Sequence, residues 1–177
     1  MRAKPDACPE AQALRSLAQL RALKHQGDLP ADERIVSGIY LSVDPDSDTS
    51  AQVSSVPGQL MDLRFRTGRA GRWLSLNIEL GDYDLSGRAV CGLMCRTRAP
   101  ETLTLRPCLR SGIKGGFHDE FFAKRVISYR EESTHADLML LDAHPEVART
   151  APWRELILFL PPDIAQMSIM DLAVFGA

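Results

Sequence analysis

The sequence predicts an all-β fold, an antiparallel β-sandwich that follows one N-terminal α-helix. At 177 residues the chain is long enough to bury a core within one domain. From residue 34 onward apolar residues recur at every second position, which is the period of a strand with one buried face. Short polar turns separate these stretches, and helices do not alternate with strands as they do in a parallel doubly wound sheet.

One helix is predicted, over residues 9–26. Pro9 suits the first helical position, and Gly27 is a natural stop. Leucine recurs at every third position, at Leu14, Leu17, Leu20 and Leu23. Such a stripe either covers an open end of the sandwich or docks onto another protein, including a second copy of the chain, and both interpretations stay open. We therefore expect two units, an N-terminal helix at 1–27 and a β-sandwich domain at 28–177.

About nine strands are predicted after the helix. They lie at 34–43, 60–66, 73–80, 88–98, 102–110, 124–130, 136–141, 155–160 and 167–175. In the clearest one, 73–80, the even-numbered residues are all apolar and predict the core face. The strand at 155–160 is apolar at successive positions, so we expect it to be central and covered on both sides. Pro107 predicts an edge or a bulge at 102–110, and 44–50 predicts a polar loop.

Charge and hydropathy argue against several classes of partner. The formal net charge of −2 gives no general attraction to nucleic acid or to an anionic membrane. No apolar run approaches the roughly 18 residues of a membrane-spanning helix. Arg15 and Gln19 interrupt the apolar positions near the N-terminus, so residues 1–20 do not match a secretory signal. We expect a cytoplasmic protein with no nucleic-acid and no membrane partner.

The four cysteines are predicted to be small buried residues with reduced thiols. They are Cys8, Cys91, Cys95 and Cys108. Cys91 and Cys95 share one face of a predicted strand about 13 Å apart, which is too far for a disulfide bond or for one metal ion. A domain of this length does not need disulfide bonds.

Arginines mark the polar faces of three predicted strands. They are Arg64, Arg66, Arg96, Arg98, Arg106 and Arg110. Asn77 and Glu79 lie on the polar side of a fourth strand, which Trp73 begins. If these strands share one sheet, its face offers planar hydrogen-bonding groups and an apolar plate, the mixture that sugar hydroxyls or the carboxylate of an acidic sugar require. The alternative is a solvated face with cross-strand ion pairs.

The segment 110–120 is a second candidate for ligand contact. Its glycines allow close approach of the backbone to a ligand, and Lys114 and His118 supply charge and a titratable ring. The alternative is a plain mobile connection between strands. The spacing does not match a phosphate-binding loop.

Motifs for catalysis are weak in this sequence. No Gly-x-Ser-x-Gly elbow and no paired histidine or cysteine spacing occurs. Glu79 with Asp62 or Glu101 is a candidate acid pair of the kind that glycoside hydrolysis uses. Trp153 precedes an apolar strand and is predicted to be a core anchor rather than a binding plate.

The C-terminal half resembles the closing strands of carbohydrate-binding modules, which belong to the galactose-binding-like β-sandwiches. The residues that carry the resemblance are Trp153-Arg-Glu-Leu-Ile-Leu-Phe-Leu-Pro-Pro162 and Met167-Ser-Ile-Met-Asp-Leu-Ala-Val-Phe175, and the likeness extends over roughly 60–176. It implies a two-sheet jelly roll that holds sugars on a concave face or in end loops, without catalysis of its own. Such modules often carry a structural calcium ion, and the resemblance implies Asp171 as one ligand.

The leading hypothesis from these observations is a non-catalytic module that recognises a carbohydrate or a similar polyhydroxylated ligand on a polar sheet face. Its candidate ligand-binding residues are Trp73, Asn77, Glu79, Arg64, Arg96, Arg106, Arg110, Lys114 and His118. One alternative is a protein-interaction or assembly domain that uses the N-terminal helix, for example to form a homo-oligomer. Another is an enzyme, which would need a concave pocket holding two carboxylates about 5–10 Å apart.

Overall fold

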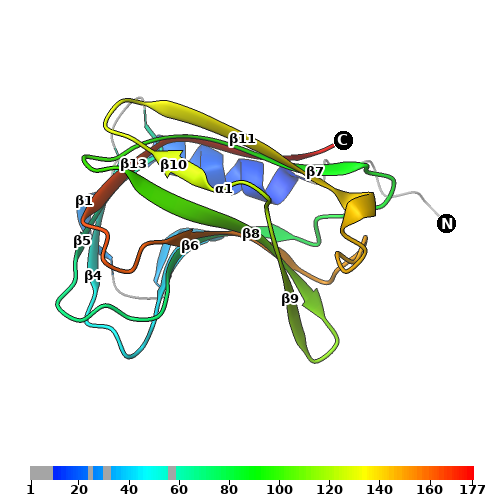
Figure 1. Ribbon diagram of the computed structural model, residues 1–177, viewed down its shortest axis with the longest axis horizontal. Coiled ribbons are helices and arrows are strands. Elements are labelled where there is room, and N and C mark those ends of the chain that lie inside the picture. Colours follow the sequence, from blue (N-terminus) through cyan, green and yellow to red (C-terminus); the bar gives the residue numbers. More distant parts are fainter. Residues whose placement is uncertain (1–9, 24–25, 30–32, 56–58) are drawn as a thin grey trace.

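The computed structural model describes residues 10–23, 26–29, 33–55 and 59–177, which form two antiparallel sheets packed face to face with one α-helix against them (Figure 1). Sheet A has the strand order β1-β4-β5-β13-β7-β11. Sheet B has the order β10-β8-β12-β6-β3-β2, and β9 pairs with β8. The prediction of an antiparallel β-sandwich with an N-terminal helix is confirmed. No described helix has the length and apolar character needed to cross a bilayer.

Sheet A consists of six strands among the described residues. They are β1 (Gln26–Leu29), β4 (Ser50–Ser54), β5 (Met61–Arg66), β7 (Val90–Arg98), β11 (Ser133–Leu140) and β13 (Gln166–Gly176). The last strand is central, because β13 pairs with β5 through its first half and with β7 along most of its length. A bulge between Ile169 and Asp171 lets β13 change its register on β7.

Sheet B contains the most apolar strands. They are β2 (Arg34–Val36), β3 (Ile39–Val43), β6 (Leu74–Gly81), β8 (Leu103–Ile113), β9 (Gly116–Phe121), β10 (Val126–Ser128) and β12 (Arg154–Leu160). β12 lies between β6 and β8, so the expectation that this strand is central is confirmed. The even-numbered positions of β6, from Leu74 to Leu80, are at most 2% exposed and face sheet A, as their alternation predicts.

Pro107 lies in an interior strand, so the edge or bulge predicted there is wrong. β8 pairs with β12 on one side in an unbroken register that includes Pro107 and Leu158. On its other side β8 pairs first with β10 and then with β9. The Pro107 carbonyl accepts a hydrogen bond from the Phe122 backbone N–H at 3.1 Å, so the proline nitrogen faces the same side. Proline is tolerated because its missing N–H lies at the gap between β10 and β9, where no strand residue needs to accept a hydrogen bond from it.

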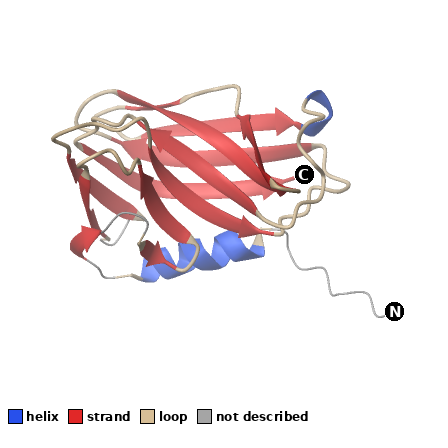
Figure 2. Ribbon diagram, turned by 90° about the horizontal axis from the view of Figure 1, so that it is seen from below, coloured by secondary structure: helices blue, strands red, loops and turns tan. Residues whose placement is uncertain are grey.

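The helix α1 (Ala11–Ala22) runs along one side of the sandwich (Figure 2). It contacts β6, β2 and β13, so it touches both sheets. Leu17 and Leu20 are fully buried against the sheets, whereas Leu14 is 50% exposed. Most of the leucine stripe therefore covers the sandwich itself, and self-association through the helix stays a prediction.

The helix is shorter than the predicted range of 9–26. Leu23 adopts an extended conformation with ψ of 129°, which ends the helix, and Gln26 begins a strand that pairs with Ser54. Residue 9 and residues 24–25 lie outside the described part of the chain. Gly27 is therefore a strand residue and not the helix stop.

The structure contains more strands than the alternation predicts. The range 34–43 is a hairpin of β2 and β3, and Gly38 adopts a φ of +81° in its turn. β4 follows the predicted loop at 44–50 and was missed, because only Ala51 and Val53 face the core between small polar residues.

Asp44 anchors the loop that joins β3 to β4. Its carboxylate accepts hydrogen bonds from the backbone N–H groups of Asp46 at 3.1 Å and of Arg72 at 2.7 Å, and from Arg72 Nε at 3.0 Å. These donors, the backbone N–H of Arg72 first, hold the pKa of Asp44 below its ordinary value. The loop is therefore tied to the segment that precedes β6.

We expect the substitution Asp44→Asn to reduce the dependence of thermal stability on acid pH. Because the folded-state pKa is lowered, the carboxylate stabilises the fold above the unfolded-state pKa of about 3.9, and this contribution is lost as the pH falls toward the folded-state value. The melting temperatures of parent and variant should differ at pH 7 and converge toward pH 3. Asp163→Asn, at an exposed carboxylate, should keep the parent's stability at pH 7. A constant difference across this range would contradict the prediction.

The described cysteines are buried and unpaired, as the sequence predicts. Cys91 and Cys95 face the core from β7. Cys108 of β8 is buried on the face of sheet B that points away from sheet A. Burial raises the pKa of each of these three thiols to about 12, so they remain protonated near neutral pH. Cys8 lies outside the described residues.

Candidate functional site

The face of sheet B that points away from sheet A is hollowed. A cavity of about 420 Å³ lies on it, lined by Tyr40, Ser42, Trp73, Ser75, Asn77, Arg110, Phe117, Ile157 and Phe159. Figure 1 shows the β8–β9 hairpin projecting from the sheet on this side, away from sheet A. We call this cavity the sheet B groove.

The floor of the sheet B groove is buried although it faces outward. Ser75 and Asn77 are each 3% exposed, and Ile157 is 1% exposed. Ser75 Oγ donates a hydrogen bond to Asn77 Oδ1 at 3.4 Å. No contact of the described residues occupies the Asn77 amide nitrogen, which leaves a donor that can serve a ligand at the base of the groove.

Aromatic rings form the sides of the sheet B groove. Tyr40, Trp73, Phe117 and Phe159 come from β3, the segment before β6, β9 and β12. The Phe159 ring lies 5.8 Å from that of Phe121. Of these four residues, only Trp73 is among the ligand-binding residues predicted from the sequence. The alternation within β3 and β12 could have identified Tyr40 and Phe159, since both are outward-facing positions of strands whose other face is buried.

The arginines of this face are already partnered. Arg110 donates to both carboxylate oxygens of Asp119, at 2.6 and 2.7 Å, and its guanidinium lies 3.9 Å from the centre of the Phe117 ring. Its hydrogen bond to Asp119 raises its pKa. Arg106 lies 4.2 Å from the centre of the Phe121 ring. These guanidinium groups hold aromatic side chains in place beside the groove.

Two glutamates face each other beyond one end of the groove. Glu155 of β12 is directly opposite Glu79 of β6, next to a bulge at which Gly81 adopts a φ of +68°. Glu79 accepts hydrogen bonds from Arg34 Nη2 at 2.6 Å and from Gln12 Nε2 at 3.5 Å. Both glutamates line a second cavity of about 420 Å³, which we call the glutamate pocket.

Tyr40 connects the glutamate pocket to the sheet B groove. Its hydroxyl donates a hydrogen bond to Glu155 Oε1 at 2.8 Å, while its ring lines the groove. Burial, followed by the bond to Glu155, raises the pKa of Tyr40 above its ordinary value. The hydroxyl therefore stays protonated and keeps the Glu155 carboxylate in position.

Trp153 lines the glutamate pocket and is 39% exposed, so the prediction that it is a core anchor is wrong. Its indole lies against Gly112, where any side chain would collide with the ring. An apolar strand after a tryptophan does not reveal that the tryptophan lies at the end of the sheet, outside the packed layer.

The six arginines of the sequence hypothesis do not share a sheet. Arg106 and Arg110 lie on β8 in sheet B with Asn77 and Glu79, close to Trp73. The others, Arg64, Arg66, Arg96 and Arg98, lie on β5 and β7 in sheet A. Alternation places each arginine on an outward face, but only the strand order decides which of the two outward faces it joins. The predicted single surface is therefore two surfaces on opposite sides of the sandwich.

The segment 110–120 is a β-hairpin in which the end of β8 pairs with β9. Its turn is Lys114 and Gly115, and Gly115 adopts a φ of +84°. Phe117 faces the groove, so His118, the next residue of the strand, faces the other way. His118 Nε2 lies 3.3 Å from Glu120 Oε2, and His144 Nδ1 lies 3.0 Å from Glu120 Oε1. Lys114 is at the tip of the hairpin.

Asp171, the implied calcium ligand, pairs with the helix instead of with a second acid. Its Oδ1 lies 2.5 Å from Arg21 Nη2 and accepts a hydrogen bond from the Leu172 N–H at 3.0 Å. Within the described part of the chain, no three or more histidine, cysteine or acidic side chains gather as a metal site would require.

No protein-family model and no curated protein matches the sequence. Solved carbohydrate-binding modules are similar to the structure. "CBM4 structure and function" matches with a TM-score of 0.63 and 11% identity, over 85% of this chain and 95% of that chain. The family 11 module of Clostridium thermocellum in complex with a beta-1,3-1,4-mixed-linked tetrasaccharide matches with a TM-score of 0.55 and 10% identity, over 86% of this chain and 96% of that chain.

A third similar structure is the CBM22-1 xylan-binding domain of Paenibacillus barcinonensis Xyn10C. It matches with a TM-score of 0.54 and 9% identity, over 86% of this chain and 95% of that chain. The resemblance noted in the closing strands is thus borne out for the fold: over 85–86% of the chain, the structure matches the jelly-roll β-sandwich of carbohydrate-binding modules.

Proposed function

We propose that the protein is a non-catalytic module that binds a carbohydrate or a similar polyhydroxylated ligand in the sheet B groove. The observation that carries this proposal is the combination of aromatic sides with a buried amide floor. The rings of Tyr40, Trp73, Phe117 and Phe159 offer apolar plates for the C–H faces of a sugar ring. Asn77 offers a fixed donor beneath them.

The charge of the groove favours an uncharged ligand. Among the described residues, Arg110 is the one charged side chain that lines it, and Asp119 pairs with this arginine through both carboxylate oxygens. The ligand therefore meets little net charge and is recognised through hydrogen bonds and ring stacking. Among the similar structures, one is described as xylan-binding and another is a complex with a tetrasaccharide, which supports carbohydrate as the class of ligand.

The test is isothermal titration calorimetry against a panel of neutral oligosaccharides that includes xylo- and mixed-linked gluco-oligosaccharides. We expect at least one to bind, and Trp73→Ala to weaken that binding by roughly tenfold or more, since aromatic anchors dominate such sites. Tyr129→Ala removes an exposed aromatic ring that does not line the groove and should bind like the parent. Equal losses in both variants, or no binding at millimolar concentrations, would overturn the proposal.

Glycoside hydrolysis is a second candidate function, because Glu79 and Glu155 are opposite each other on adjacent strands. The Cβ atoms of such neighbours lie about 5 Å apart, so the two carboxyl groups can approach the separation of about 5 Å that retaining glycosidases use. The test is release of reducing ends from the same oligosaccharides over prolonged incubation. Activity that Glu155→Gln abolishes while binding persists would support an enzyme. Intact oligosaccharides would leave recognition alone as the function.

A further inference from the structure

We propose that sheet A carries a separate anion-binding pocket, on the opposite side of the sandwich from the sheet B groove. It is a cavity of about 210 Å³ lined by Arg98, Ala99, Pro100, Arg130, Gln166 and Ser168. Its ligand is an oxyanion group: a carboxylate, sulfate or phosphate, either as a free ion or carried on an acidic sugar. We call it the arginine pocket.

Two exposed arginines, Arg98 and Arg130, line the arginine pocket, and no described acidic residue lines it with them. Neither the Arg98 side chain nor the Arg130 side chain makes an ion pair or a hydrogen bond with any other described residue. By contrast, Arg96, which lies two residues earlier on the same face of β7, pairs with Glu132 at 3.4 Å. Like charges placed in one concavity repel each other, and an oxyanion between them removes this repulsion.

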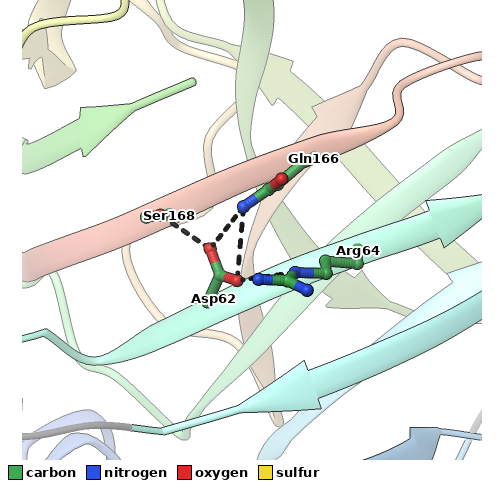
Figure 3. Close-up of polar contacts among 4 residues, drawn as sticks. All are labelled: Asp62, Arg64, Gln166 and Ser168. Carbon is green, nitrogen blue, oxygen red and sulfur yellow. Dashed lines mark hydrogen bonds and ion pairs between the residues drawn. The ribbon is translucent and has the colours of Figure 1, made fainter. Parts of the chain in front are cut away.

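Asp62 is the acid nearest to Arg98 in the strand register, and its carboxylate oxygens accept hydrogen bonds from other residues. Asp62, Ser168 and Arg98 form one row across β5, β13 and β7. Figure 3 shows the Asp62 carboxylate surrounded by donors: Ser168 Oγ at 2.7 Å, Gln166 Nε2 at 3.3 and 3.4 Å, and Arg64 Nε at 3.2 Å. The Asp62 oxygens therefore accept from Ser168, Gln166 and Arg64, and no ion pair joins Asp62 to either arginine of the pocket.

The same contacts fix the floor of the arginine pocket before any ligand arrives. Asp62 and Ser168 are only 7% and 4% exposed. Because both Ser168 and Gln166 donate to Asp62, these two lining side chains are held in one arrangement. This fixed floor loses little conformational entropy on binding, so the cost of ordering falls on the two arginine side chains.

The chemistry of the sides selects an oxyanion rather than a halide. A planar guanidinium presents parallel N–H groups that match two oxygens of a carboxylate, sulfate or phosphate. With two such forks, the pocket can contact a single oxyanion from two directions. A volume of about 210 Å³ holds an ion of this size or the acidic group of one sugar.

The test measures binding at constant ionic strength, with sodium chloride as the balancing salt. Sulfate, phosphate, acetate and trigalacturonate are titrated calorimetrically against the parent, Arg98→Ala, Arg130→Ala and the double variant. We expect saturable binding of at least one anion, weakened roughly tenfold or more in each single variant. Arg125→Ala removes an exposed arginine outside the pocket and should bind like the parent. All four arginine variants should keep the parent's melting temperature.

The source of the oxyanion follows from the same titrations. If trigalacturonate binds more tightly than acetate, and its fully methyl-esterified form does not bind, the pocket is assigned to an acidic sugar. If trigalacturonate and acetate bind with equal affinity, the pocket is assigned to a free ion. Trp73→Ala should leave anion binding unchanged, so this result is independent of the sheet B groove. Absence of saturable binding, or an equal loss in Arg125→Ala, would overturn the proposal.

Discussion

Replacing Arg154 with methionine is expected to lower the free energy of unfolding by about 3 kcal/mol. Arg154 is 1% exposed, and its Nε donates a hydrogen bond to the Tyr83 carbonyl at 2.7 Å. Its two terminal nitrogens donate to Ser111 Oγ and to the Ala148 carbonyl. One side chain thus joins β8 to the turns before β7 and β12. Methionine fills much of the space but leaves these acceptors buried without a donor.

This arginine has no carboxylate partner among the described residues, and burial lowers its pKa. Arg154→Lys should also destabilise the fold, because one ammonium group cannot reach acceptors in three directions. Urea unfolding followed by circular dichroism measures both variants, and Arg125→Met, at an exposed position, should stay within about 0.5 kcal/mol of the parent. If the Arg154→Met variant were as stable as the parent, the three hydrogen bonds would contribute nothing beyond the cost of burying the charge.

The second large effect is expected at Asp62, where alanine should lower the free energy of unfolding by about 2 kcal/mol. The substitution removes the acceptor of the Ser168 hydroxyl, which is buried, and of the donors of Gln166 and Arg64 (Figure 3). Because Asp62 of β5 is directly opposite Ser168 of β13, the loss falls on the pairing of two interior strands of sheet A.

A double-mutant cycle with Ser168→Ala separates the hydrogen bond from the rest of the effect. When both partners are removed, no buried hydroxyl is left without an acceptor, so the double variant should be more stable than the sum of the single losses predicts, by about 1 kcal/mol. Urea unfolding supplies all four free energies. Strict additivity would show that the Asp62–Ser168 contact does not contribute to the fold.

Local alternation was sufficient to predict the strands that form the core. β6 and β13 lie within a residue or two of their predicted ranges, since a run of alternating leucines and isoleucines has only one face that can be buried. Shorter strands were missed. β4 has two small or medium apolar residues between serines and a glutamine, and its stability comes from pairing with β5 and β1 rather than from its own composition.

The candidate site was predictable only in part. Asn77, Glu79, Trp73 and Arg110 were assigned to outward faces. The structure places three of them on strands of sheet B and Trp73 in the segment just before β6. Phe117 and Phe159 were not singled out, although they supply much of the apolar surface of the groove. The position of Phe117 depends on the way the β8–β9 hairpin departs from the sheet, which is a property of the assembled sheet and not of either strand alone.

From its sequence this protein could be recognised as an antiparallel sandwich with one helix, because burial of one strand face leaves a period of two in the residues themselves. Tertiary structure alone decided which strands are neighbours. That order divided the arginines between two sheets, brought Glu79 opposite Glu155, and gathered Arg98 and Arg130 around one pocket. The physical reason is that alternation specifies on which side of its own strand a residue lies, whereas a binding site requires several strands to meet, and their pairing is set by contacts far apart in the chain.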